Sequence, residues 1–302
     1  MLIKILSKKN IKVIENFWND HTCGKREFSH NNLSDYYKDL SNIRYKEHHE
    51  LHSLVEFKKF KNKKVLEIGL GVGNDASEFV KYKAIYNGID LSKNSVDFCK
   101  KRLNFLYKSG EILQGNAEYL PYKDESFDFV YSFGVIHHTE YPNLIVDEIQ
   151  RVLKKNGSFF VMVYNRSSIF YKLEILVCRR LLLLMWFLKL NILLTFLLKG
   201  KLKIKAINYF HKLKQRYKSN PFISNQELLN HSTDGVDCPL SRVYNKKESL
   251  ELFIKFKNLK THCFFMEKKH SIIWILFGFI LNKYESFLSK KFGWFRIIEG
   301  KK

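Results

Sequence analysis

The segment Val65–Gly73 constrains the fold of this chain more than any other part of the sequence. A short apolar run, VLEI, is followed there by GLGVG, a cluster of three alternating glycines. An apolar run that ends in glycines predicts a buried strand and a tight turn. Glycine lets the backbone turn sharply and approach a ligand closely, and the amide groups that open a following helix lie nearby. We therefore expect a ligand-binding turn before a helix at residues 74–82.

A second strand, predicted over residues 86–90, ends on Asp90, seventeen residues after Gly73. A carboxylate at that place can accept hydrogen bonds from both hydroxyls of a ribose. Turn and carboxylate together predict a cofactor that contains adenosine. The dinucleotide fingerprint G-x-G-x-x-G does not fit, because Asn74 stands where its last glycine belongs. A nicotinamide oxidoreductase is therefore disfavoured.

Strand and helix patterns alternate through residues 60–166. Further strands are predicted at residues 111–114, 127–132 and 158–164, and helices from Ser92 through Leu103 and at residues 144–153. This order and spacing imply right-handed crossovers and a parallel, doubly wound sheet. The sequence thus predicts an α/β, Rossmann-like domain.

Four segments resemble class I S-adenosylmethionine-dependent methyltransferases, especially the subgroup that includes quinone-biosynthesis methyltransferases. They are VLEIGLGVGND, YNGIDLSKNSVDFCKKRL, GNAEYLPYKDESFDFVYSFGVIHH and EIQRVLKKNGSFFVMVYN. The resemblance implies S-adenosylmethionine as cofactor and a mostly parallel, seven-stranded sheet with helical lids before strand one and after strand five. We divide the chain accordingly into an N-terminal helical lid (1–59), a cofactor-binding core (60–166), a helical acceptor cap (167–258) and the strands that complete the sheet (259–302).

The resemblance also assigns the cofactor-binding residues position by position. The methionine half of the cofactor would lie on the glycine turn, the ribose on the second strand's carboxylate, and the adenine on residues 116–118. The assigned residues are Glu67, Gly69, Gly71, Gly73, Asp90, Leu91, Asn116, Ala117, Glu118, Ser132 and Phe133. The family usually has Asp at position 116 to accept a hydrogen bond from the adenine amino group. The amide oxygen of Asn116 can accept the same bond, so we expect weaker binding rather than none.

Candidate residues for catalysis and for binding the methyl acceptor lie outside these segments and on the loop after the fourth strand. His137 and His138 stand on that loop, where they either act as a general base or only shape the loop. Arg44 and Tyr45 are assigned to the cofactor's carboxylate, with a surface pair as the alternative. Arg242 and Tyr244 are assigned to the acceptor pocket.

Other motifs in the sequence do not point to a specific reaction or ligand. The segments Phe17–Gly24 and Asp234–Tyr244 resemble an uncharacterised group of methyltransferases. His48, His49 and His52 look like metal ligands on paper, but neighbouring residues of a helix point in different directions. We therefore predict no metal. Ser132–Val135 stands where amino-methylating DNA enzymes carry D-P-P-Y or N-P-P-Y, which disfavours a nucleic-acid substrate.

Charge divides the chain into two unequal halves. Residues 1–166 carry 26 basic and 21 acidic side chains, whereas residues 167–302 carry 26 basic and 9 acidic ones, for a net charge of +22 overall. The five cysteines include no C-x-x-C pair, which fits a reducing, cytoplasmic compartment.

The run Leu181–Leu198 is apolar enough to enter a membrane, and eight basic residues follow it in Lys199–Lys218. A single span would separate the C-terminal strand from its sheet, so we expect this run to be covered by protein or to lie on a membrane surface. The basic residues would favour anionic headgroups; a solvated helix face is the alternative. The prediction is a cytoplasmic, peripherally membrane-associated enzyme.

The sequence as a whole predicts a methyltransferase that transfers a methyl group from S-adenosylmethionine to a small or lipid-linked acceptor, most readily on oxygen and secondly on nitrogen. An RNA methyltransferase is the first alternative because of the positive charge. A non-catalytic protein that binds the cofactor or a lipid surface is the second.

Overall fold

The computed structural model of the protein describes residues 2–28, 32–107, 109–190, 200, 203–204, 207–208, 222–235, 238–268 and 271–302. Among these residues, seven strands form one sheet in the order β3-β2-β1-β4-β5-β7-β6. The strands are β1 (Lys64–Ile68), β2 (Ile85–Asp90), β3 (Glu111–Gln114), β4 (Phe127–Phe133), β5 (Leu153–Tyr164), β6 (Lys257–Phe264) and β7 (Phe295–Lys301).

The first five strands pair in parallel, and β7 inserts antiparallel between β5 and β6. This confirms the predicted α/β, Rossmann-like, seven-stranded and mostly parallel sheet. β5 begins at Leu153, before the predicted start at residue 158, and includes Asn156, which has a φ of 62°. Its register with β4 shifts between Phe127 and Phe129. β6 begins at Lys257, two residues before the predicted start of the last segment.

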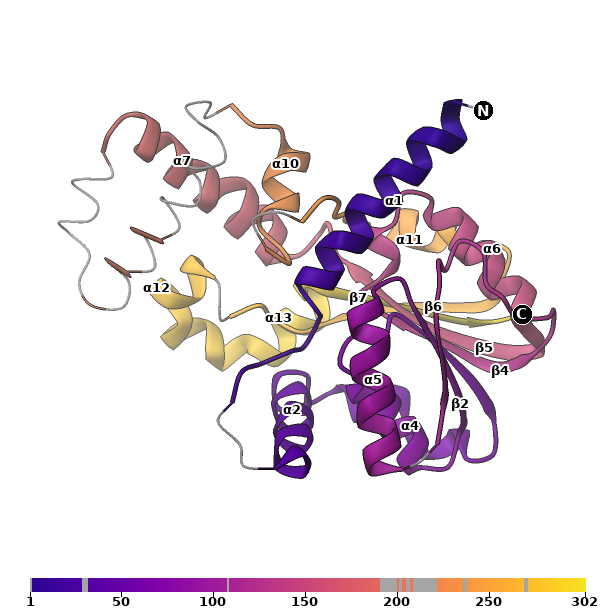
Figure 1. Ribbon diagram of the computed structural model, residues 1–302. Helices are drawn as coiled ribbons and strands as arrows, with labels where there is room; N and C mark the ends of the chain where they lie inside the picture. The colour runs from indigo at the N-terminus through magenta and orange to yellow at the C-terminus, as the bar shows by residue number, and fades with distance from the viewer. Residues whose placement is uncertain are drawn as a thin grey trace.

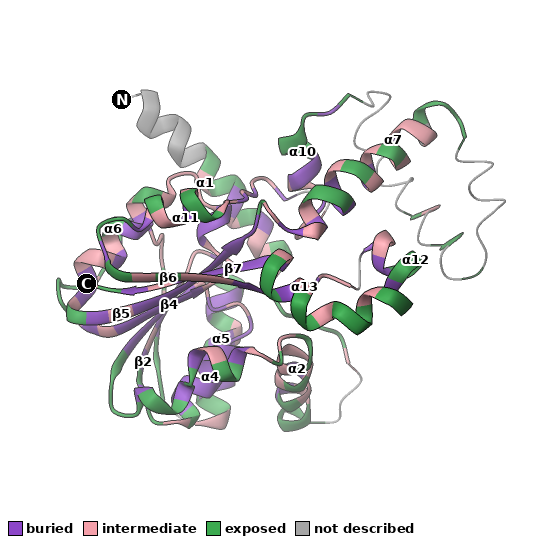
Figure 2. Ribbon diagram, turned by 180° about the vertical axis from the view of Figure 1, so that it is seen from behind, coloured by how far each residue is buried: buried purple, intermediate pink, exposed green. Residues whose placement is uncertain are grey.

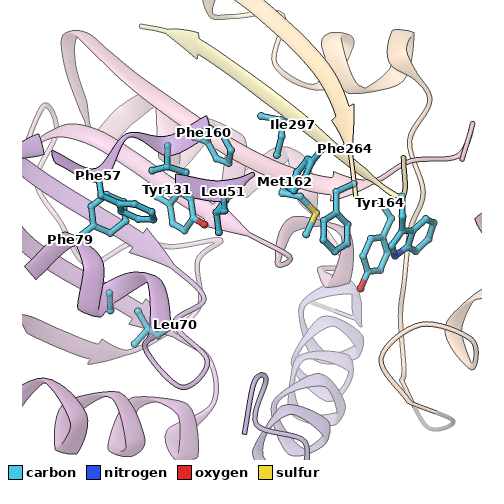
Figure 3. Close-up of a cluster of buried hydrophobic side chains, with 14 of the residues drawn as sticks. Leu51, Phe57, Leu70, Phe79, Tyr131, Phe160, Met162, Tyr164, Phe264 and Ile297 are labelled. Carbon is cyan, nitrogen blue, oxygen red and sulfur yellow. The ribbon is translucent and has the colours of Figure 1, made fainter. Parts of the chain in front are cut away.

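Helices cover both faces of the sheet (Figure 1). On one face lie α3 (Leu51–Val55), the short helix η1 (Phe57–Phe60), α4 (Asn74–Lys81) and α5 (Lys93–Leu106), and on the other α6 (Pro142–Val152) and α11 (Lys246–Leu252). Side chains of a strand alternate between faces. In β5, Phe160 and Met162 join the first cluster, and Phe159 and Val161 join the second. Figure 3 shows the first cluster along the sheet, with Tyr164 near one end.

The remaining helices lie in the N-terminal segment, in the loop after β4, between β5 and β6, and between β6 and β7. They are α1 (Leu2–Asp20), α2 (Leu33–Glu47), η2 (Ile136–His138), the π-helical η3 (Phe170–Arg179), α7 (Arg180–Phe187), α10 (Asn225–Asn230), α12 (Ile272–Leu281), η4 (Asn282–Tyr284) and α13 (Glu285–Phe292). In Figures 1 and 2, α7, α10 and α12 gather to one side of the sheet. Most of Lys199–Lys218, and residues 191–198 of the leucine-rich run, lie outside the described residues.

Candidate cofactor and acceptor site

The glycine turn lies between β1 and α4, as predicted. Gly69 and Gly71 have φ values of 82° and 52°, a region that side chains with a Cβ rarely adopt. A Cβ on Gly71 would also lie 2.7 Å from the backbone oxygen of Cys23. That oxygen accepts a hydrogen bond from the amide of Val72 at 3.1 Å. The turn therefore needs glycine both for its conformation and for the close passage of the segment after α1.

Glu67 is buried below this turn, with 2% of its surface exposed. The hydroxyl of Tyr86 donates to its Oε2 at 2.6 Å. Burial raises the pKa of Glu67 well above its usual value. The side chain thus joins β1 to β2, and its assignment to the cofactor site stays a prediction.

Asp90, at the end of β2, lies directly against the turn. Its Oδ2 accepts hydrogen bonds from the amides of Leu70 at 2.8 Å and Gly71 at 3.2 Å, and its Oδ1 accepts one from Ser92 at 2.8 Å. Burial raises the pKa of Asp90 to about 6, although these bonds favour the carboxylate. Turn and carboxylate are therefore adjacent. The assignment of Asp90 to the ribose stays a prediction.

The end of α1 is fastened beside Asp90. The Asn19 side-chain oxygen accepts hydrogen bonds from the Ser92 hydroxyl at 2.9 Å and the Asn94 amide at 3.2 Å. The Asn94 side chain donates to the backbone oxygen of Asn19 at 2.8 Å. The N-terminal segment thus closes over the carboxyl end of β2, where a lid was predicted.

The residues assigned to the adenine lie after β3. The Asn116 side-chain oxygen accepts a hydrogen bond from the amide of Glu118 at 3.0 Å, so one of its two lone pairs is used within the loop. Leu91 and Ala117 are partly buried, and Glu118 is 4% exposed. The loop holds its own shape, and the second lone pair of Asn116 is the one left to accept from an adenine.

Ser132 and Phe133 end β4 beside the turn. The Ser132 hydroxyl donates to the backbone oxygen of Ile68 at 3.3 Å, which ties the two strand ends together. A Cβ on Gly69 would lie 2.1 Å from a methyl group of Val135. The loop after β4 therefore touches the glycine turn and brings η2 to it.

Arg44 and Tyr45 have a different partner from the one predicted. The Arg44 guanidinium donates to Asp75 through Nη2 at 2.6 Å and Nε at 3.3 Å, and the Tyr45 hydroxyl donates to the same carboxylate at 2.9 Å. Tyr131 adds a fourth bond at 2.8 Å. Arg44 therefore pairs with a buried acid rather than forming a surface pair, and its assignment to the cofactor's carboxylate stays a prediction. It neutralises this acid at the start of α4, 5% exposed, which the sequence analysis missed.

His138 has a carboxylate partner from the cap segment. Its Nε2 lies 3.2 Å from Oδ2 of Asp234, and its Nδ1 lies 2.7 Å from the backbone oxygen of Leu240. Both ring nitrogens thus face acceptors, as in an imidazolium. Burial opposes the charge, but Asp234 outweighs it and raises the pKa of His138 to about 10. The Tyr164 hydroxyl also donates to Asp234, at 2.9 Å.

Asp234 is the more accessible member of this pair. Its side chain is 23% exposed, whereas that of His138 is 4% exposed. The indole of Trp18, on α1, packs edge-on against the His138 ring at 5.0 Å. The pair therefore lies between the lid, the cap and the loop that contacts Gly69. We call His138, Asp234 and Tyr164 the acceptor cluster.

His137 is fully buried, and its ring lies tilted against that of Tyr164, with the ring centroids 3.8 Å apart. Burial and the neighbouring His138 lower its pKa well below the usual value, so it is neutral. This environment fits the alternative that His137 shapes the loop. A catalytic role for either histidine stays a prediction.

Arg242 and Tyr244 lie next to the acceptor cluster: the Arg242 amide donates to the backbone oxygen of His137 at 2.9 Å, and the Tyr244 amide donates to that of Tyr164 at 2.8 Å. Their assignment to the acceptor pocket stays a prediction. The Arg242 guanidinium donates to the backbone oxygens of Thr139 and Glu140, at 3.4 and 3.2 Å, and so braces the loop after η2. The backbone of Tyr244 pairs with Asn165, and its ring packs on the apolar cluster beneath α6 and α11. Both residues hold the cap against the sheet.

A further group of ligand-type atoms comprises His138, Asp234 and Cys238. Cys238 Sγ lies 3.8 Å from Nδ1 of the ring, whereas Asp234 lies at Nε2. Asp234 and Cys238 thus contact different nitrogens of one imidazole, and one ligand-type atom of each residue lies within 4.8 Å of the other two. The three side chains form one polar cluster.

Comparisons with known proteins place the same residues in a family context. Residues 66–161 match the protein family described as "Methyltransferase domain". A fatty-acid O-methyltransferase of Mycolicibacterium smegmatis is 34% identical over 110 residues, which are 36% of this chain and 39% of that enzyme. A phthiotriol/phenolphthiotriol dimycocerosates methyltransferase of Mycobacterium tuberculosis is 35% identical over 99 residues, 32% of this chain and 36% of that enzyme.

The chain spans less than half the length of these curated relatives. A solved structure from Pyrococcus horikoshii OT3 covers 95% of this chain and 98% of its own, with a TM-score of 0.51 and 14% identity. That likeness concerns the fold alone.

Proposed function

We propose, from the premise that residues 66–161 of this chain form a class I S-adenosylmethionine-dependent methyltransferase domain, that the protein methylates an oxygen of a small or lipid-linked acceptor, with nitrogen as the second choice. The cofactor supplies an activated methyl group bound to a sulfonium, and its sulfur takes the electron pair when the methyl leaves. The fit rests on the turn of Gly69 and Gly71 with Asp90 beside it.

The observation that carries the acceptor chemistry is the His138–Asp234 pair beside the loop that contacts Gly69. Asp234 is partly exposed and negative, so it can accept a hydrogen bond from an acceptor hydroxyl or amine and orient the lone pair. As the acceptor gains its methyl, positive charge develops on it, and the carboxylate stabilises that charge and takes the proton. His138 and Tyr164 position the carboxylate.

The proposal of a lipid-linked acceptor is supported by the names of the two curated relatives. The two named above carry lipid acceptors in their names, a fatty acid and phthiotriol dimycocerosates, and neither is named for a quinone. We therefore favour an amphiphilic acceptor over a quinone. The net charge of +22 keeps RNA as the alternative substrate class.

The test is incubation of a cell extract with radiolabelled S-adenosylmethionine and the full chain, followed by partition into lipid, RNA, protein and small-molecule fractions. We expect label in the lipid or small-molecule fraction, and its loss with Asp234→Asn. Label that enters bulk RNA would establish the alternative. Cofactor binding with no label in any fraction would contradict catalysis.

A further inference from the structure

We infer that the helical pair α12–α13 is a docking surface for a membrane leaflet with anionic headgroups. α12 has several exposed residues, drawn green in Figure 2, and all of them are apolar; α13 adds Phe287. The most prominent, with exposed fractions from 49% to 80%, are Leu276, Phe277, Phe279, Ile280 and Phe287. Apolar patches of this kind mark interaction surfaces. This inference does not depend on the identity of the methyl acceptor.

The pair lies on a membrane rather than crossing it. Among the described residues, Ile272–Phe292 is the helical segment that is long and apolar enough to span a bilayer. However, the chain leaves β6 at Phe264 and enters β7 at Phe295, and these two residues pair directly in the sheet. A crossing would separate the two ends by about the thickness of the hydrocarbon core, roughly 30 Å. The chain must therefore return to the side from which it left.

The surface is anchored to the rest of the protein. Oε2 of the buried Glu174, on η3, accepts hydrogen bonds from the Ser271 hydroxyl at 3.1 Å and from the amides of Ile272 and Ile273 at 2.7 and 3.2 Å. A carboxylate at a helix N-terminus satisfies otherwise unpaired amides. The start of α12 is thereby fixed, so its apolar face is presented in one orientation.

A second row of apolar residues lies on the neighbouring element. Leu173, Val177 and Leu181 are four residues apart on η3 and α7, and each is between 45% and 54% exposed. α7 and α12 lie on the same side of the sheet in both views (Figures 1 and 2). The exposed apolar residues thus come from two segments far apart in the sequence.

The charged residues of the α12–α13 pair favour an anionic membrane leaflet as its binding partner. Lys283, Lys290 and Lys291 are exposed on the pair. Within residues 272–292 the single acid is Glu285, and Lys268 binds it at 2.5 Å. The surface therefore presents cations next to apolar side chains. A second copy of the chain would oppose like charges across this face, whereas an anionic leaflet complements both features.

The test is co-sedimentation of the full chain with vesicles of phosphatidylcholine alone or mixed with phosphatidylglycerol. We expect binding to the anionic vesicles that weakens as salt rises. Phe279→Asp with Phe287→Asp should reduce the partition coefficient at least about tenfold. Each of Lys283→Gln, Lys290→Gln and Lys291→Gln should reduce it by about fivefold. Ile254→Asp is the matched control, because Ile254 is 73% exposed and follows α11, which lies apart from α12 and α13 in Figure 1. This variant should bind vesicles like the parent.

Four results would overturn the inference. The first is that the parent does not bind anionic vesicles, and the second is that Ile254→Asp loses as much vesicle binding as the surface variants. The third is that the parent is a dimer that Phe279→Asp dissociates without changing vesicle binding. The fourth is that Phe279→Asp lowers thermal stability without any change in vesicle binding. The last two would assign the surface to a second copy or to another part of this chain. Cofactor affinity is measured on each variant as a check of folding, so a failure here is separate from a failure of the proposed methylation.

Discussion

The proposed cofactor half and the proposed acceptor half of the site are built in different ways. Around Asp90, the contacts are backbone amides donating to one carboxylate, and the partners lie within about one βαβ unit. Around Asp234, the contacts join side chains whose positions in the chain differ by 70 residues for Tyr164 and by 96 for His138. A half made from local backbone geometry leaves a motif in the sequence. A half made from distant side chains does not.

The substitution Arg44→Gln should show the largest effect of those considered, and the effect should be on the unfolding free energy. Replacement by Gln leaves the buried Asp75 without its cation, which we expect to cost about 3–5 kcal/mol of unfolding free energy, measured by denaturant titration. Arg26→Gln is the matched control, because its pair with Glu47 is exposed and spans 3.9 Å. That control should cost under about 1 kcal/mol. If Arg44→Gln lost cofactor affinity at unchanged stability, the original assignment to the cofactor would be restored.

Asp234→Asn probes the acceptor half alone. We expect kcat to fall by about 100-fold, because the amide can neither take the proton nor stabilise positive charge on the acceptor. Cofactor affinity should stay as in the parent. Asp97→Asn, on the exposed face of α5, serves as the control and should leave both quantities unchanged. Equal losses of affinity and kcat in Asp234→Asn would mean that the cluster belongs to the cofactor half.

Gly71→Ala probes the cofactor half alone. The new Cβ meets the Cys23 backbone at a strained φ, so we expect a cost of about 1–3 kcal/mol in cofactor binding, seen by calorimetry. Gly200 also has a positive φ, 56°, but has open space around it. Gly200→Ala therefore introduces backbone strain at a positive φ without a steric clash of the new Cβ. It should leave cofactor affinity unchanged. A Gly71→Ala protein that binds as tightly as the parent would remove the turn from the site.

The His138–Asp234 pair predicts a pH dependence of stability. The pKa of His138 is raised from 6.5 to about 10, so its contribution is fully present below about pH 6.5 and is lost as pH rises through about 10. We expect the unfolding free energy to fall by up to about 1.4 kcal/mol per pH unit in that window. The reference is the double variant His138→Gln with Asp234→Asn. Parallel pH curves for the two proteins would rule out the ion pair.

The sequence predicted the parts of the molecule that depend on local pattern. The sheet, the turn and the place of Asp90 follow from apolar runs, glycines and strand ends, which neighbouring residues determine. The pairing of Arg44 with Asp75 was not predicted, because Asp75 lies on another element and the contact forms only once α2 packs on α4. Asp234 was missed as a partner of His138, although its segment resembled an uncharacterised methyltransferase group.

The apolar run at residues 272–281 shows a further limit of sequence patterns. Hydrophobic composition alone does not distinguish a helix that is buried from one that is exposed. The pairing of Phe264 with Phe295 decides how the intervening helices can lie, and that pairing is a property of the sheet.

The most direct test of the central claim is a calorimetric titration of S-adenosylmethionine into the parent protein and into Asp90→Asn. The account predicts saturable one-site binding by the parent. It also predicts affinity at least about tenfold weaker in Asp90→Asn, since a hydrogen bond to a charged group contributes about 1.5–3 kcal/mol. The absence of binding by the folded parent, or equal affinity in the two proteins, would contradict it.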